Sequence, residues 1–365
     1  MSAPFGKFFL PGPTEVLPEI LEAQARPMIG HRGPETEALL AAVDQPLRSV
    51  FRSTNPVMIG TCSATGFMEA AIKNGVKKKV LCLVNGAFSQ RFADIATACG
   101  TDHHVAKVPE GSTFEADQVT ALLEETGADA VTMVHSESAT GALNPVGEIS
   151  AAIHAAGDAM VLVDGVTSVG GSPVEFDKWK LDFLVTGSQK ALALPPGLAF
   201  AAASPRFMER AKSLPARGYY FDLVVYDEQI RKHQTPYTPA VSLFYSLHAQ
   251  LGRIIASGGI EERWARHDAM RTRVETWALA NADSLGIEYL PREGRRSWTV
   301  SCLKLRHPEP PGGAIAKRME ARGFTIAPGY GKLKDSTIRI GHMGDHTVPE
   351  VDAVLAALSE VLRRG

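Results

Sequence analysis

Cysteine is scarce in this chain, and its few copies are scattered. The four cysteines, Cys62, Cys82, Cys99 and Cys302, show neither metal-ligand spacing nor the spacing of a disulfide framework. This usage is typical of a reducing compartment and predicts a cytoplasmic protein. The neighbouring pair His103–His104 lies on a strand-like stretch, where adjacent side chains point to opposite faces, so we expect no metal site.

Long apolar runs and a surplus of charge of one sign are also missing. No run of about 18 apolar residues occurs, which excludes an obvious membrane span. The first residues, 1–7, contain no long apolar segment, so no signal peptide is expected. The formal net charge is −2, which gives no general attraction to nucleic acid or to an acidic membrane. We therefore expect neither of these partners.

The glycine patterns of common nucleotide sites are absent as well. No Gly-x-Gly-x-x-Gly motif follows the first expected strand. The stretch 329–332 superficially resembles a phosphate loop, but Leu333 stands where that motif needs a hydroxyl residue. A non-catalytic nucleotide-binding module is therefore the weaker interpretation.

What the chain does have is a regular alternation of short apolar runs and longer amphipathic or alanine-rich segments. Hydrophobic residues make up 45% and charged residues 21%, which is typical of a globular protein. The length of 365 residues favours one large domain with a smaller companion. Continuous apolar runs predict strands buried on both faces of a mainly parallel sheet, at 80–84, 130–134, 160–163, 183–185 and 198–202. Helices are expected between them at 89–99, 116–126 and 146–156. The alternation predicts an α/β domain with ligands at the carboxyl ends of its strands.

The pattern changes after about residue 250. Helices are expected at 243–257, 261–282, 313–322 and 348–363, with strands at 298–305 and 337–340. This mixture predicts a smaller α+β domain. We expect an N-terminal arm over 1–20, a large domain over 21–255 and a small C-terminal domain over 256–365.

Three polar features interrupt the apolar runs where α/β proteins bind ligands. Asp164 follows four apolar residues and would be partly desolvated there, although it could simply cap the next turn. Lys190 lies at the mouth of a buried strand, where desolvation would lower its pKa and suit Schiff-base chemistry, although a lone lysine more often reaches solvent. The turn 137–141 brings small hydroxyl residues to the same edge, but it also fits a plain polar turn.

Taken together, these features are typical of a pyridoxal phosphate site. That cofactor needs a lysine for its aldehyde and a carboxylate for its ring nitrogen. It also needs a phosphate cradle, which the small and hydroxyl residues at 61–70 offer at the start of a helix. Many helices begin in this way, so the cradle alone indicates little.

At this point the chain resembles the class V, fold-type I pyridoxal-phosphate-dependent aminotransferases, in particular the alanine–glyoxylate and serine–pyruvate aminotransferase group. The resemblance extends nearly from end to end, and the family's motifs come in order. They lie at 11–14, 30–32, 63–65, 85–91, 137–141, 164–168, 187–192, 195–197, 238–241 and 339–344.

The resemblance implies a fold and a set of site residues. The fold is a large domain with a mainly parallel, seven-stranded sheet between helices, plus a smaller C-terminal α+β domain. Lys190 would bind the cofactor as a Schiff base and move the substrate's alpha proton, while Asp164 would pair with the ring nitrogen. The remaining cofactor contacts would come from Ser63, Ala64, Thr65, Phe88, Ser138, Val166 and Gln189, with Thr238, or less convincingly Tyr237, reaching in from a second subunit. The active unit would then be a homodimer.

Arg339 is the expected anchor for the substrate, together with Gly12 and Pro13. A guanidinium fork binds an alpha-carboxylate through two parallel hydrogen bonds, which a lysine does not reproduce. The alternative is an arginine at the exposed end of a strand.

The reaction implied is a ping-pong transamination from alanine or serine to glyoxylate or pyruvate. Phosphoserine or aminophosphonate aminotransferases remain alternatives, since His31 and Arg32 could supply cations for a phosphate. Cysteine desulfurases and other lyases of this fold are a further alternative, but the stretch 324–334 contains no cysteine and Cys302 lies in an apolar run. The side chains expected to line the substrate pocket are Tyr219, Tyr220, Tyr330, His31 and Arg32.

Overall fold

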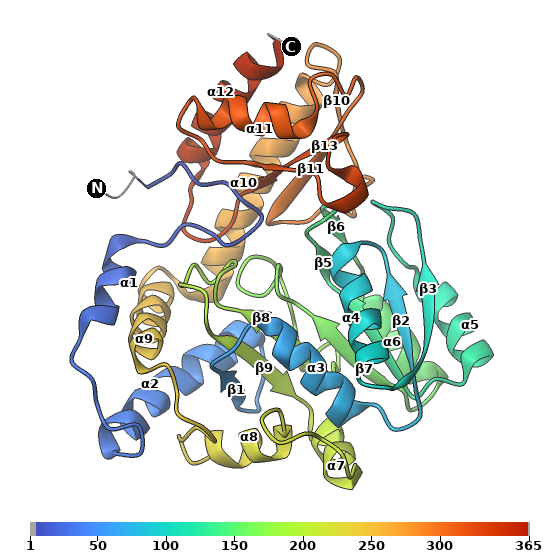
Figure 1. Ribbon diagram of the computed structural model, residues 1–365, viewed down its shortest axis with the longest axis vertical. Coiled ribbons are helices and arrows are strands. Elements are labelled where there is room, and N and C mark those ends of the chain that lie inside the picture. The colour runs from blue at the N-terminus through green and yellow to red at the C-terminus, as the bar shows by residue number, and fades with distance from the viewer. Residues whose placement is uncertain (1–4, 364–365) are drawn as a thin grey trace.

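The computed structural model describes residues 5–363, and its largest element is a seven-stranded sheet (Figure 1). The strand order is β1 (Val57–Gly60), β9 (Ala199–Ala203), β8 (Phe183–Gly187), β7 (Met160–Asp164), β4 (Ala130–Val134), β2 (Lys79–Val84) and β3 (Asp102–Lys107). All neighbours pair in parallel except β9, which is antiparallel to both β8 and β1. Every residue of β4, β7, β8 and β9 is buried, which explains why these strands are continuous apolar runs.

Helices cover this sheet on both sides and fill the connections between its strands. They are α1 (Pro18–Glu22), η1 (Ala23–Ala25), α2 (Pro34–Phe51), α3 (Ala64–Gly75), α4 (Ala87–Ala98), α5 (Ala116–Thr126), α6 (Val146–Ala156), α7 (Pro205–Ser213), α8 (Leu223–Ile230) and α9 (Val241–Ala256). α3 and α4 pack side by side, α3 against β7 to β9 and α4 against β2 to β4. A short hairpin of β5 (Ser136–Glu137) and β6 (Ala142–Leu143) extends from the end of β4. The expected α/β architecture is confirmed.

The C-terminal part builds a second sheet with its own hydrophobic core, as expected. The antiparallel order is β10 (Ile287–Tyr289), β11 (Val300–Leu305), β13 (Thr337–Gly341) and β12 (Ala327–Pro328). Three helices and a 3₁₀ turn complete it: α10 (Gly259–Ala280), α11 (Gly312–Glu320), η2 (Gly331–Leu333) and α12 (Val348–Arg363). α10 joins the two parts, because Trp264 packs in the large core and Met270 in the small one. The division at residues 20 and 255 stays a prediction.

The segment from Phe9 to Thr14 runs between the small sheet and the loop that follows β8 (Figure 1). The Phe9 amide donates to the Thr325 carbonyl over 2.7 Å, and the Phe9 carbonyl accepts from the Gly341 amide over 2.8 Å. The Thr14 amide donates to the Gln189 carbonyl over 2.9 Å. A side chain at Gly341 would overlap the backbone of Leu10, so only glycine permits this close approach.

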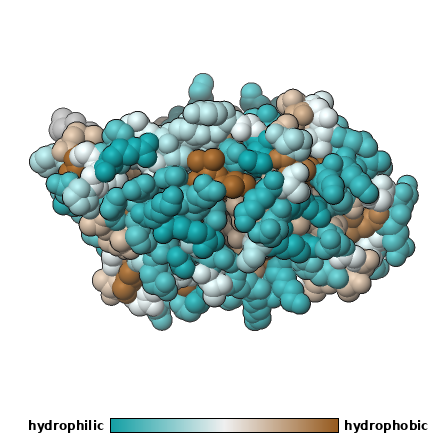
Figure 2. All heavy atoms as spheres, turned by 90° about the horizontal axis from the view of Figure 1, so that it is seen from below, coloured by the Kyte–Doolittle hydropathy of each residue, from teal (hydrophilic) through white to brown (hydrophobic). Residues whose placement is uncertain are grey.

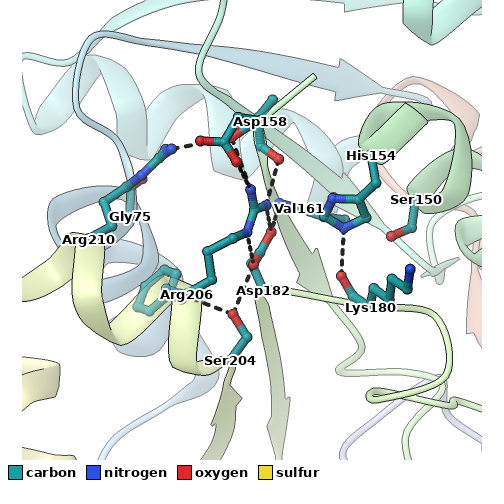
Figure 3. A network of polar contacts seen from close by, with 12 residues as sticks. Gly75, Ser150, His154, Asp158, Val161, Lys180, Asp182, Ser204, Arg206 and Arg210 are labelled. Atoms are coloured by element: carbon teal, nitrogen blue, oxygen red, sulfur yellow. Dashed lines mark hydrogen bonds and ion pairs between the residues drawn. The ribbon is translucent and has the colours of Figure 1, made fainter. Parts of the chain in front are cut away.

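The edge of the large sheet formed by the amino ends of β7 and β8 is closed by ion pairs (Figure 3). The Arg206 guanidinium donates to the buried Asp182 carboxylate from Nη2 over 2.6 Å and also pairs with Asp158. Asp182 accepts further hydrogen bonds from the Val161 amide over 2.9 Å and the Ser204 hydroxyl over 2.8 Å. The polar groups at this edge therefore satisfy one another, and in open α/β sheets ligands bind at the opposite, carboxyl edge.

The face seen from below in Figure 2 is largely hydrophilic, with hydrophobic residues in small separate groups. Within residues 5–363, none of the helices has both the length and the apolar composition needed to cross a bilayer.

Candidate active site

A cavity of about 250 Å³ opens at the carboxyl edge of the large sheet. Its lining includes Lys190 and Asp164 together with these other residues expected from the sequence: Gly12, Pro13, Ser63, Ala64, Thr65, Phe88, Ser138, Val166 and Gln189. Met68, Arg91, Val134, Ser136 and Thr167 also line it. The structure thus brings together in one place residues that are separated by up to about half the chain.

The register of the parallel strands explains this convergence. Val134 of β4 lies opposite Asp164 of β7, and Asp164 lies opposite Val185 of β8. The segments after these strands therefore leave the sheet at one edge and surround the same space. The loop after β8 carries Lys190 to this space, three residues beyond the end of the strand.

Asp164 is almost completely enclosed, with 4% of its surface exposed. Its Oδ1 atom accepts a hydrogen bond from the Val166 amide over 2.7 Å. Burial raises the pKa of Asp164 to about 6, although this hydrogen bond favours the ionised form. A buried carboxylate of this kind is ready to pair with a protonated ring nitrogen.

Lys190 is buried beside Asp164, and its amine donates a hydrogen bond to the Pro11 carbonyl. Burial lowers the pKa of Lys190 to about 8, while the charge of Asp164 acts in the opposite direction. A neutral amine is consequently accessible near physiological pH, as nucleophilic attack on an aldehyde requires. Gly12 has a φ of +114°, and a side chain there would overlap the lysine amine.

The start of α3, where the sequence predicts an anion cradle, lies at the cavity. Ser63 occupies the N-cap position without making a side-chain capping bond, so the first turn of the helix stays available to a ligand. Arg91 lies beside it, with Nη1 3.3 Å from the Thr65 hydroxyl oxygen. The cavity thus offers an amine, a carboxylate and an anion-binding helix end, which are the groups that pyridoxal phosphate requires.

Phe88 lies in the first turn of α4, where a buried carboxylate fixes the helix end. Glu137 accepts hydrogen bonds from the Phe88 amide over 3.1 Å, the Ser89 amide over 2.9 Å and the Ser89 hydroxyl over 3.0 Å. Negative charge at a helix N-terminus is favourable, because it opposes the positive end of the helix dipole. Arg91, one helical turn later, holds its guanidinium 4.8 Å from the Phe88 ring centroid. Glu137 therefore fixes the backbone at Phe88, and the Arg91 guanidinium lies against its ring.

Arg339 lies on β13, outside the set of cavity-lining residues but close to it. Its side chain donates from Nη1 to the Ser138 carbonyl and from Nε to the Pro328 carbonyl, each over 3.0 Å. The residue is 7% exposed, and burial lowers its pKa. Five N–H donors are present in a guanidinium, so these two bonds leave donors for a carboxylate.

Thr238 is not brought into the cavity of its own chain. It is exposed on the loop between α8 and α9. Its expected contact with a second subunit's cofactor therefore stays a prediction. The same loop is held by Arg32, which donates from Nη1 to the Thr235 carbonyl over 2.6 Å and from Nη2 to the Pro236 carbonyl over 3.2 Å.

Arg91, Glu137 and Pro11 were not singled out as site residues from the sequence. Arg91 and Glu137 lie inside motifs that carry the family resemblance, and the spacing of Phe88 and Arg91 places both on one face of a helix. That spacing could have indicated Arg91. Nothing in the sequence indicates that the Pro11 carbonyl meets the lysine, because a backbone acceptor has no residue signature.

Cys302 and the stretch 324–334 bear on sulfur chemistry. Cys302 is fully buried in β11, and burial raises its pKa to about 12, which keeps the thiol protonated and weakly nucleophilic. Among residues 5–363 no group of three or more histidine, cysteine or acidic side chains is arranged to hold a metal ion.

Comparison with known proteins decides the family. The family model for aminotransferase class-V matches residues 22–317. The chain is a class V aminotransferase. It is accordingly a pyridoxal-phosphate-dependent transaminase with the fold-type I architecture, as the sequence analysis expected.

Several relatives match along most of their length. An uncharacterised aminotransferase of Methanocaldococcus jannaschii is 38% identical, over 97% of this chain and 92% of the relative. The L-aspartate–glyoxylate aminotransferase of Paracoccus denitrificans is 31% identical, over 93% and 86%. The serine–glyoxylate aminotransferase of Methylorubrum extorquens is 30% identical, over 92% and 86%.

Solved structures agree with these relatives. An alanine–glyoxylate aminotransferase from Nostoc sp. superposes with a TM-score of 0.91 at 28% identity, covering 100% of this chain and 97% of that one. A Thermus thermophilus aspartate aminotransferase of subgroup IV superposes with a TM-score of 0.89 at 31% identity, covering 98% and 99%.

Proposed function

We propose that this class V aminotransferase transfers the amino group of alanine or serine to glyoxylate or pyruvate, as a cytoplasmic homodimer. The observation that carries the proposal is the pairing of a buried lysine amine with a buried carboxylate in one cavity, beside a buried arginine with spare donors. Lys190 would hold the cofactor, Asp164 would pair with the ring nitrogen, and Arg339 would bind the substrate carboxylate.

Each of these side chains has a task that its surroundings support. Bound pyridoxal phosphate supplies an electron sink for the pair of electrons left when the alpha proton is removed. Lys190 would act as the base for that proton, and its lowered pKa matches a proton transfer near neutral pH. Arg339 orients the amino acid, since its free guanidinium donors suit a carboxylate.

The cofactor phosphate would be bound by the first turn of α3, through Ser63, Ala64 and Thr65, with Gln189 beside it. Phe88 would pack on one face of the cofactor ring and Val166 on the other, while Ser138 would lie near the phenolic oxygen. Gly12 and Pro13 would border the substrate. All of these residues line the cavity, which supports assigning them to the same site.

Two observations bear on the choice of substrate. Glyoxylate recurs in the names of relatives whose amino donors differ, including aspartate, serine and alanine. Arg32, a candidate ligand for a substrate phosphate, donates instead to two backbone carbonyls of its own chain. This engagement favours a substrate without a phosphate group over phosphoserine or an aminophosphonate.

The assembly and location belong to the same proposal. Thr238 is exposed on a loop that also carries Tyr237, and Tyr219 beside it is 86% exposed, so this surface is available to a second subunit. The four cysteines carry free thiols, which fits a reducing cytoplasm.

The test is a half-reaction screen on the cofactor-loaded protein. Loss of the bound cofactor's visible absorbance, and formation of the matching 2-oxo acid, are followed with alanine, serine, phosphoserine and aminoethylphosphonate. We expect reaction with alanine and serine, and none above background for Lys190→Ala. Lys107→Ala, at an exposed lysine of β3, is the control and should react like the wild type. Turnover by Lys190→Ala at the control rate would refute the assignment.

A further inference from the structure

Tyr330 stands at the mouth of the site, between the residues proposed for the cofactor and for the substrate. Its ring centroid lies 5.4 Å from that of Phe88, and 5.5 Å from Cζ of Arg339. The residue belongs to the short segment between β12 and η2, and 43% of its surface is exposed. One ring from the small sheet's connections therefore covers both the cavity wall and the proposed carboxylate anchor.

The segment that carries Tyr330 is fixed by hydrogen bonds on both sides of the ring. The Gly329 amide donates to the Thr337 carbonyl over 2.8 Å, and the Leu333 amide donates to the Tyr330 carbonyl over 3.1 Å. The Thr337 hydroxyl donates to the Leu333 carbonyl over 3.0 Å. This closed network holds the backbone at Tyr330 in one position.

Close packing reinforces the same segment. A side chain at Gly329 would overlap the Leu333 carbonyl, so the chain approaches itself as closely as glycine allows. The Pro328 carbonyl accepts the hydrogen bond from Arg339 Nε, which ties the segment to the proposed anchor itself. The backbone that carries Tyr330 and the Arg339 guanidinium are consequently tied to each other.

We propose that the Tyr330 ring is a fixed steric limit at the substrate site, which restricts the amino acid to side chains no larger than those of alanine and serine. This inference rests on the proposed function, because it takes Arg339 as the carboxylate anchor. A substrate carboxylate at Arg339 and an alpha carbon near Lys190 direct the substrate side chain towards the space beside Phe88. Tyr330 lies outside the cavity-lining residues but against both Phe88 and Arg339, so its ring would bound that space on its outer side.

The rigidity of the segment is what makes this steric limit select against larger substrate side chains. A mobile loop would move aside for a larger substrate, whereas a hydrogen-bonded turn has to be deformed at a cost in binding free energy. Removing the partly exposed ring should open that space to a larger substrate, because the hydrogen-bonded backbone does not move in to refill it. Larger amino acids should then be accepted.

The experiment compares alanine with phenylalanine in half-reactions of the holoenzyme. The wild type should favour alanine by about a hundredfold or more in kcat/KM, in the range that steric exclusion from a pocket produces. Tyr330→Ala should raise the ratio of phenylalanine to alanine at least about tenfold, through a gain with phenylalanine. Tyr330→Phe should keep the wild-type ratio, because the ring and not the hydroxyl limits the space.

Binding without chemistry gives an independent readout. Calorimetric dissociation constants of propionate and 3-phenylpropionate should differ strongly for the wild type and converge in Tyr330→Ala. Tyr330→Leu, which keeps an apolar contact with Phe88, provides the same measurement if the alanine variant fails to fold. Leu279→Ala, an exposed residue of α10, is the surface control and should leave both ratios unchanged.

The outcomes separate this inference from the proposed function. If the wild type reacts with no amino acid, the proposed function is wrong, and so is the steric limit assigned to Tyr330. If the wild type reacts with alanine and phenylalanine equally well, or neither truncation changes the ratio, Tyr330 does not set the size limit although the transaminase assignment stands.

Discussion

Two side chains of the cavity have pKa values displaced towards neutrality, and both displacements cost stability. Asp164 and Lys190 are buried, and burial disfavours whichever form carries the charge. Their reactivity and their cost to folding therefore have one cause. A bound cofactor should offset part of this cost, since it offers each of the two side chains a partner.

Asp164 yields a prediction about pH. The folded protein keeps a proton on this group up to a pKa of about 6, against an ordinary 3.8. Folding therefore binds a proton between these values, and the free energy of unfolding should fall as pH rises from about 4 to about 6. Asp164→Asn cannot titrate, so the cofactor-free variant should be more stable at pH 7 by up to about 3 kcal/mol.

Urea unfolding of cofactor-free protein at several pH values measures this difference. Asp102→Asn, at an exposed carboxylate of β3, serves as the control and should keep the wild-type slope. A slope in Asp164→Asn equal to that of the wild type would contradict the displaced pKa.

For single residues, the sequence predicted the charged side chains that interrupt an apolar pattern. Asp164 and Lys190 were predicted because each follows an apolar run, where a charged residue needs an explanation. Arg91 was missed because an arginine on an amphipathic helix breaks no pattern. The Pro11 carbonyl was beyond prediction, since its approach to Lys190 depends on a contact across 179 residues.

Among the elements, α4 depends on one buried carboxylate from outside the helix. Glu137 is fully buried and accepts the amides of Phe88 and Ser89, so it replaces the N-cap side chain that Gly86 lacks. Its removal would leave these donors unsatisfied within the protein interior.

Glu137→Ala should lower the free energy of unfolding by about 3 kcal/mol and weaken cofactor binding, because Phe88 loses its fixed position. Glu137→Gln retains an acceptor oxygen and should lose less of both. Denaturant unfolding and titration of the cofactor-free protein with pyridoxal phosphate measure the two effects. Asp117→Ala, at the exposed first turn of α5, is the matched control and should change stability by less than about 1 kcal/mol. Equal losses of unfolding free energy in Glu137→Ala and Asp117→Ala would contradict the role of the buried Glu137 carboxylate at the start of α4.

The elements themselves were predictable where burial is uniform. The expected strand 130–134 and the expected helices 116–126 and 146–156 agree with β4, α5 and α6 to the residue. β3 was recognised only as a strand-like stretch around His103–His104 and not as a strand of the buried sheet, because it lies at the sheet edge and its residues alternate in exposure instead of forming an apolar run. α2 was not assigned either, since it buries one face only and contains Pro46.

For the whole molecule, a buried ionic cluster connects the segment after β13 to the loop that carries Lys190. Asp345 accepts hydrogen bonds from Arg263 over 2.8 Å and from Gln250 over 2.8 Å. Arg263 also donates to the Ala191 carbonyl, and Gln250 to the Leu192 carbonyl. Burial alone would raise the pKa of Asp345, but Arg263 and Gln250 hold the pKa well below its usual range.

Asp345→Asn should therefore lower the free energy of unfolding by about 3 kcal/mol, because it leaves buried guanidinium groups without a counter-charge. It should also reduce turnover, since the residues following Lys190 lose their support. Thermal and denaturant unfolding of the holoenzyme measure the first effect, and the alanine half-reaction measures the second. Asp352→Asn breaks a half-exposed pair with Arg273 and should change stability by at most about 1 kcal/mol. A smaller loss for Asp345→Asn than for Asp352→Asn would refute the role of the cluster.

The overall architecture followed from alternation and from the change of pattern near residue 250. The cluster around Asp345 did not, because its members come from α9, α10 and the end of β13, and no local pattern links them. The expected contact of Thr238 with a second subunit came from the family resemblance alone, since an exposed loop residue has no sequence pattern that indicates a partner.

The segment from Phe8 to Thr14 has a consequence for the order in which the molecule is made. On the ribosome these residues emerge long before their partners, as the contact of the Phe8 carbonyl with His346 spans 338 residues. Until β13 has been synthesised, the segment has no strand to join and the pocket around Lys190 lacks one wall. The large sheet can form during translation, whereas the pocket around Lys190 is completed only after β13 has been synthesised. Nascent chains stalled before β13 should consequently have a folded sheet and no competence to transfer amino groups.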